Sequence, residues 1–96
     1  MMLTFRGYTD TLKFSTYRSG QTRMDLIGFT EGPIATCTVA LVDQPPAEGC
    51  VWIKDYSENE GMLEMLEKAG VVQRTGRVTV SGYVTIPEAK LLIRKE

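Results

Sequence analysis

The sequence predicts a single α+β domain over residues 1–96, in which a twisted, mainly antiparallel β-sheet carries one amphipathic helix on one face, at about residues 58–69. Two patterns support this fold class. Most of the chain alternates apolar and polar residues with a period of two, in short segments separated by turn residues. Helical spacing occurs in one segment, where four apolar residues fall at i, i+3, i+4 and i+7: Met62, Met65, Leu66 and Ala69.

Five strands are expected before the helix, at residues 2–8, 11–17, 22–29, 34–42 and 50–56. The short connections between the early strands make neighbouring strands antiparallel. The segment from Gly7 to Asp10 reads as a turn in which Asp10 hydrogen-bonds the backbone. The fourth strand is the longest and is apolar on both faces, so it is placed at the centre of the sheet.

After the helix, short strands are expected from residues 71–72, over residues 77–80 and over residues 83–86, with turns at residues 75–76 and 81–82 between them. Pro87 has no amide proton and is expected to break the run. Residues 88–95 fit both a strand and a helix start, and their alternation favours the strand.

The helix start is predicted at Ser57, because Ser57-Glu58-Asn59-Glu60 matches a capping box. In that motif Ser57 accepts a hydrogen bond from the Glu60 amide, and Glu60 reaches back to the Ser57 amide. Asp55 lies just before this helix end, where the helix dipole favours a negative charge.

The residue types present exclude several kinds of chemistry. The chain has no histidine, and Cys37 and Cys50 are expected to be small buried hydrophobic residues rather than a disulfide. Asp55, Ser57 and Asn59 alternate as in the opening of a calcium loop, but the sixth and twelfth positions of that loop do not match. No nucleophile motif, phosphate loop or dinucleotide fingerprint occurs. The sequence therefore predicts a protein that is not an enzyme and holds no metal or cofactor.

The chain contains no apolar run long enough to span a membrane, and residues 1–6 alternate rather than forming the apolar block of a signal peptide. A cytoplasmic location is therefore expected.

Charge is unevenly distributed along the chain. Residues 31–67 contain eight acids and a single base, although the net charge of the chain is only −1. On the helix, Glu60, Glu64 and Glu67 fall on a face different from that of the apolar stripe. Such a stripe is more often solvated than functional, but it also fits a contact surface for a basic partner. The candidate partner-binding residues are Asp55, Tyr56, Glu58, Glu60, Glu64 and Glu67.

The run Val51 to Leu63, VWIKDYSENEGML, together with residues 33–39, resembles a family of small uncharacterised bacterial proteins carried by phages, plasmids and conjugative elements. Gly7-Tyr8 and residues 12–14 also fit, so the resemblance extends over most of the chain, and IKDYSENEGM is its specific part. No activity is known for this family, and the resemblance implies no catalytic residue. It implies an accessory protein of a mobile element, of the kind that inhibits host defence by stoichiometric binding.

These observations favour a non-enzymatic protein-binding module that inhibits a host nuclease-type defence complex, as an anti-CRISPR does, through an acidic face. The expected partner is a host protein or complex with a basic surface. The alternative is a nucleic-acid-binding accessory protein that uses basic N-terminal hairpins, which carry Arg6, Lys13, Arg18 and Arg23. A homodimer is also possible, through an exposed sheet edge or through the methionine-rich helix.

Overall fold

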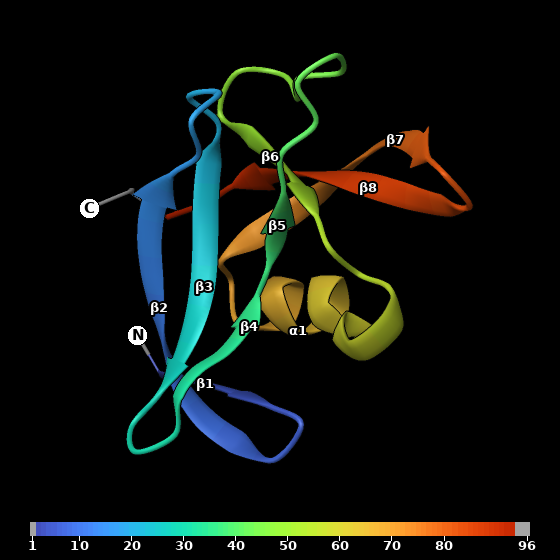
Figure 1. Cartoon of the computed structure of the whole chain (residues 1–96). Coiled ribbons are helices and arrows are strands. Elements are labelled where there is room, and N and C mark those ends of the chain that lie inside the picture. Colours follow the sequence, from blue (N-terminus) through green and yellow to red (C-terminus); the bar gives the residue numbers. More distant parts are fainter. Residues whose placement is uncertain (1, 94–96) are drawn as a thin grey trace.

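A computed structural model describes residues 2–93 and shows an α+β fold (Figure 1). The elements are β1 (Met2–Phe5), β2 (Tyr8–Thr16), β3 (Thr22–Gly28), β4 (Gly32–Thr36), β5 (Thr38–Val39), β6 (Cys50–Ile53), the 3-10 turn η1 (Ser57–Asn59), α1 (Met62–Lys68), β7 (Val72–Ser81) and β8 (Val84–Leu91). No helix in this part of the chain is long and apolar enough to cross a membrane.

The strands form two antiparallel four-stranded sheets rather than one. The first has the order β1-β2-β3-β4, and the second has the order β5-β6-β8-β7. Buried side chains from both sheets and from α1 form one hydrophobic core, which includes Leu26, Ile53 and Leu66. The predicted fold class, an antiparallel α+β fold with one helix packed against strands, is thus confirmed.

The strand expected at residues 34–42 is the point at which the chain passes from one sheet to the other. β4 is an edge of the first sheet, β5 is an edge of the second, and Cys37 lies between them. The Cys37 amide donates to Met24 O (2.8 Å), and Cys37 O accepts from the Lys54 amide (2.8 Å). The prediction of one central strand is wrong, because packing against two sheets also produces apolar residues on both faces.

The prediction of a turn at residues 7–10 is wrong, because β2 already begins at Tyr8. The turn is at Arg6-Gly7, where both residues have positive φ, and Asp10 belongs to β2. Asp10 is fully buried opposite Leu3 and Gly28, and neither carboxylate oxygen has a hydrogen-bond partner. Burial, reinforced by the charge of Glu31, raises the pKa of Asp10.

β7 and β8 form one long hairpin instead of several short strands. The expected turn at residues 75–76 is a bulge, since the pairing shifts register between Arg74 and Val78. Pro87 lies inside β8 and does not break it. The pairing of β8 with β6 ends at Glu88, so no partner in that ladder requires an amide proton from Pro87. β8 extends to Leu91, as the strand prediction expected, while residues 94–95 of that prediction lie outside the described residues.

Candidate functional site

The six candidate residues lie at the corner between β6 and α1 and along α1. The helical segment expected at residues 58–69 is divided into η1 and α1, with Gly61 in the left-handed conformation (φ 95°) between them. α1 buries Met62 and Leu66, as the apolar spacing predicts, and also Leu63, while Met65 and Ala69 are partly buried against the core. The predicted packing face is therefore correct, but the helix begins later.

Asp55 caps α1. Its Oδ1 atom accepts hydrogen bonds from the amides of Gly61 (3.1 Å) and Leu63 (3.0 Å). The predicted capping box is wrong, because neither η1 nor α1 has a side-chain cap from Ser57 or Glu60. Ser57 instead takes positive φ (53°) in the reversal that brings Asp55 back to the helix end.

Three of the candidate acids form ion pairs within the chain. Glu58 pairs with Lys54 (2.8 Å) and Glu64 with Lys68 (3.1 Å), both at i, i+4 spacing. Glu67 accepts from both the guanidinium (2.7 Å) and the backbone amide (3.0 Å) of Arg74 in β7. Hydrogen bonding from Lys54 lowers the pKa of Glu58, and hydrogen bonding from Arg74 lowers the pKa of Glu67.

Glu60 differs from these acids. It is exposed, and no described residue forms an ion pair with its carboxylate. Its backbone groups are engaged instead: the amide donates to Ser57 O (3.2 Å), and the carbonyl accepts from Arg6 Nη2 (3.5 Å). Tyr56 is half-buried, with Lys54 Nζ 5.9 Å from the centre of its ring. Glu60 is thus the candidate acid best placed to receive a cation from outside the chain.

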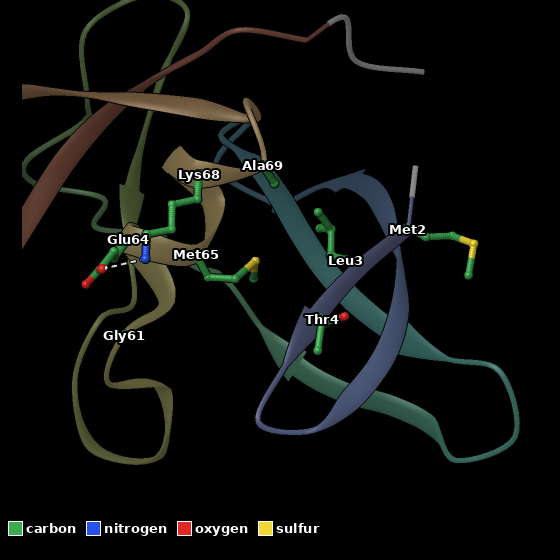
Figure 2. Close-up of a pocket in the computed structure, with 8 residues that line it drawn as sticks. All are labelled: Met2, Leu3, Thr4, Gly61, Glu64, Met65, Lys68 and Ala69. Carbon is green, nitrogen blue, oxygen red and sulfur yellow. Dashed lines mark ion pairs between the residues drawn. The ribbon is translucent and has the colours of Figure 1, made fainter.

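An open pocket of about 490 Å³ lies between α1 and β1, lined by Met2, Leu3, Thr4, Gly61, Glu64, Met65, Lys68 and Ala69 (Figure 2). Met65 reaches from α1 toward β1, and the Glu64–Lys68 ion pair lies on the helix beside it. The sequence pointed to Glu64 but not to the pocket, because β1 and α1 are far apart in the chain. The signals of this site that were visible in the sequence are the i, i+4 spacing of Glu64 and Lys68 and the apolar stripe that contains Met65 and Ala69.

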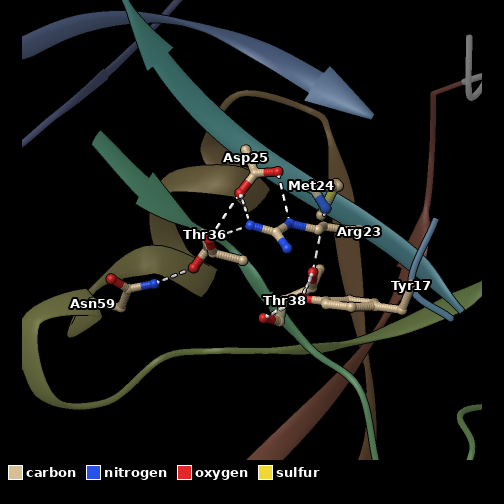
Figure 3. Close-up of polar contacts among 7 residues, drawn as sticks. All are labelled: Tyr17, Arg23, Met24, Asp25, Thr36, Thr38 and Asn59. Atoms are coloured by element: carbon tan, nitrogen blue, oxygen red, sulfur yellow. Dashed lines mark hydrogen bonds and ion pairs between the residues drawn. The ribbon is translucent and has the colours of Figure 1, made fainter. Parts of the chain in front are cut away.

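The residues that alternate as in a calcium loop would have to converge to hold an ion, but Asp55 and Asn59 have separate partners. Asp55 caps the helix, and Asn59 is buried and donates to Thr36 O at 2.6 Å (Figure 3). Thr36 in turn donates to Asp25 Oδ1 (2.8 Å), which belongs to the Arg23–Asp25 ion pair. Asn59 therefore fixes the corner to the segment that joins the two sheets.

The basic residues of the N-terminal hairpins do not gather into one surface. Arg6 follows β1 and Arg18 follows β2, so they lie at opposite ends of β2. Arg23 is paired with Asp25 (2.9 Å), and Lys13 stands opposite Asp25 in the β2–β3 pairing. An acid therefore lies within the region that the nucleic-acid alternative requires to be basic.

The sequence did not reveal a buried carboxylate at Glu88, which is 1% exposed. Glu88 accepts hydrogen bonds from the Ala47 amide (2.9 Å) and the Thr75 hydroxyl (2.7 Å), and it pairs with Arg77 (2.9 Å). Burial opposes ionisation, but the hydrogen bonds from Ala47 and Thr75 and the charge of Arg77 together lower the pKa of Glu88. Glu88 thus ties β8 to the β7 bulge and to the loop before β6.

Both cysteines are free. Cys37 is fully buried, and burial raises the pKa of its thiol to about 12. Cys50 is half-buried, and burial also raises its pKa. The expectation of two small buried residues without a disulfide thus agrees with Cys37, whereas Cys50 is free but only half-buried.

Comparison of the chain with protein-family models, with curated proteins and with solved structures found no match.

Proposed function

We propose that this chain is a small non-enzymatic protein-binding module, and that its contact surface is the pocket between α1 and β1 with the charged residues beside it. The observation that carries the proposal is the combination of apolar and charged groups at this pocket. Leu3, Met65 and Ala69 supply apolar surface, while Glu64 and Lys68 lie on α1. Glu60, next to the pocket residue Gly61, has a free carboxylate.

This combination fits a protein segment in which an apolar side chain is flanked by Lys or Arg. The apolar side chain enters the pocket, and the neighbouring cation meets Glu60. Glu64 is also available, because both it and Lys68 are largely exposed (68% and 77%) and such exposed ion pairs contribute little stability. Exchanging Lys68 for a cation of the partner therefore has a low cost.

The finer proposal is that the partner is a host nuclease-type defence complex and that the chain inhibits it stoichiometrically, as an anti-CRISPR does. It is supported by the mobile-element resemblance of residues 51–63 and by the acids at the corner. Proteins that bind nucleic acids have basic surfaces, which attract acidic partners and accelerate their association.

The test begins with affinity purification of tagged protein from a host lysate and continues with titration of the purified partner. Two variants address the surface: Glu60→Lys/Glu64→Lys reverses the charges, and Thr4→Tyr fills the pocket without changing charge. The matched control is Asp43→Lys/Glu48→Lys, which makes the same change in net charge at exposed residues of the connector before β6.

We expect both surface variants to weaken binding about tenfold or more, equivalent to roughly 1.4 kcal/mol, while the control binds as the wild type does. Equal affinities for all four proteins would contradict the proposed surface. A gel shift that weakens steeply with salt, with no protein partner recovered, would instead support the nucleic-acid alternative.

A further inference from the structure

The outer part of the β7–β8 hairpin has an apolar surface that is mostly exposed in the structure of residues 2–93. Val78 and Val80 are 59% and 60% exposed, and Tyr83 at the turn is fully exposed. Figure 1 shows this end of the hairpin extending to one side of the molecule. The two valines share one face of β7, whereas Thr79, on the other face, contacts Gln44 of the connector.

The turn geometry determines which backbone groups of β7 are free. Ser81 pairs with Val84 across a two-residue turn whose first residue, Gly82, has positive φ (60°), as in a type II′ hairpin. Ser81 and Val84 are therefore a hydrogen-bonded pair, and the pairs alternate along the strand. It follows that Thr79 bonds to β8, whereas Val78 and Val80 direct their N–H and C=O groups to the open edge.

This edge has no described partner. β7 is the last strand of its sheet and pairs with β8 alone. Natural edge strands are usually blocked by charged side chains, proline or bulges. Here the bulge lies before Val78, and the segment from Val78 to Ser81 contains no charge and no proline. The unprotected part of the edge is thus short and lies beyond the bulge.

We propose that a second copy of this chain pairs with this edge, antiparallel, about a two-fold axis at Thr79. With that axis, Val78 of one copy stands opposite Val80 of the other, and each such pair exchanges two backbone hydrogen bonds. The valines of both copies then form one apolar strip on the same face. Arg77 stands opposite Ser81, so the pairing brings no like charges together. The sequence Val-Thr-Val is therefore complementary to itself in side chains, hydrogen bonding and charge.

Sedimentation of the purified chain over a wide concentration range tests the proposal. We expect a species of twice the 10.7 kDa chain mass. Val80→Pro should shift it to the monomer, because the Val80 amide faces the open edge and its loss leaves the hairpin's own hydrogen bonds intact. Tyr83→Ser is the control, since it removes an exposed aromatic ring without changing the edge. Circular dichroism checks that each variant is folded.

A cross-link tests the axis itself. Thr79 and its symmetry mate form a non-hydrogen-bonded pair, in which Cα atoms lie about 4.5 Å apart, within the range of a disulfide. In a Cys50→Ser background, Thr79→Cys should form an interchain disulfide under mild oxidation, whereas Thr85→Cys, exposed on β8, should not. A wild-type monomer at all concentrations would overturn the proposal, as would a dimer unaffected by Val80→Pro or equal cross-linking at both positions.

Discussion

Replacing Asp55 by alanine should destabilise the protein by about 2 kcal/mol. The Asp55 carboxylate accepts hydrogen bonds from the Gly61 and Leu63 amides at 3.1 and 3.0 Å. Loss of a helix cap costs about 0.5–2 kcal/mol, and hydrogen bonds to a charged group contribute about 1.5–3 kcal/mol, so the expected loss lies where these ranges meet. For a domain of this size, 2 kcal/mol lowers Tm by about 8–16 °C.

Urea unfolding followed by circular dichroism and by Trp52 fluorescence measures this loss. Asp55→Asn keeps an acceptor without the charge and should lose less stability. Ser57→Ala should change stability by no more than about 0.5 kcal/mol, because Ser57 is exposed and caps nothing. A loss at Ser57 as large as that at Asp55 would refute the assigned cap and restore the capping box.

Three further outcomes are expected. Asp10→Asn should raise the free energy of unfolding at neutral pH. This gain should shrink as pH falls through the raised pKa of Asp10, because the wild-type carboxyl is then protonated and its burial costs less. Urea unfolding at a series of pH values measures the gain and its pH dependence. Glu88→Gln should lower the free energy of unfolding at neutral pH. The difference from the wild type should disappear as pH falls through the lowered folded pKa of Glu88, because the wild-type side chain then loses its charge as well. A thiol reagent at mildly alkaline pH should modify Cys50 well before Cys37, as peptide mapping would detect; equal rates would contradict the burial of Cys37.

Patterns carried by neighbouring residues were sufficient to predict several elements. The helical spacing from Met62 to Leu66 identified the buried face of α1, and alternation identified the strand at residues 22–29, in which Met24 and Leu26 are buried. Both patterns depend on one element burying one face, which is a local property of the sequence.

Features that depend on how distant segments meet were not predictable in this way. A segment apolar on both faces looks the same whether it is a central strand or, like residues 34–42, crosses between two sheets. The cap at Asp55 requires the chain to reverse between Ser57 and Gly61, and capping-box spacing alone does not encode that reversal. Glu88 belongs to a segment that fitted both a strand and a helix in the sequence. Its burial was not predictable, because its partner Arg77 lies across the hairpin.

The candidate site shows the same division. The pairing of Glu64 with Lys68 follows from their spacing in the sequence, but that of Glu67 with Arg74 requires β7 to return beside α1. The pocket likewise exists only because β1 lies beside the helix. The sequence therefore indicated the acids, and the fold distinguished Glu60 from those that already have partners.

Comparative capture from a host lysate tests the central claim, protein binding at the α1–β1 pocket, most directly. The wild type, Glu60→Lys/Glu64→Lys and the Asp43→Lys/Glu48→Lys control are each immobilised, and bound proteins are quantified by mass spectrometry. We predict that the wild type and the control retain the same basic host protein and that the Glu60/Glu64 variant loses it. Retention of the same proteins by all three would contradict the claim.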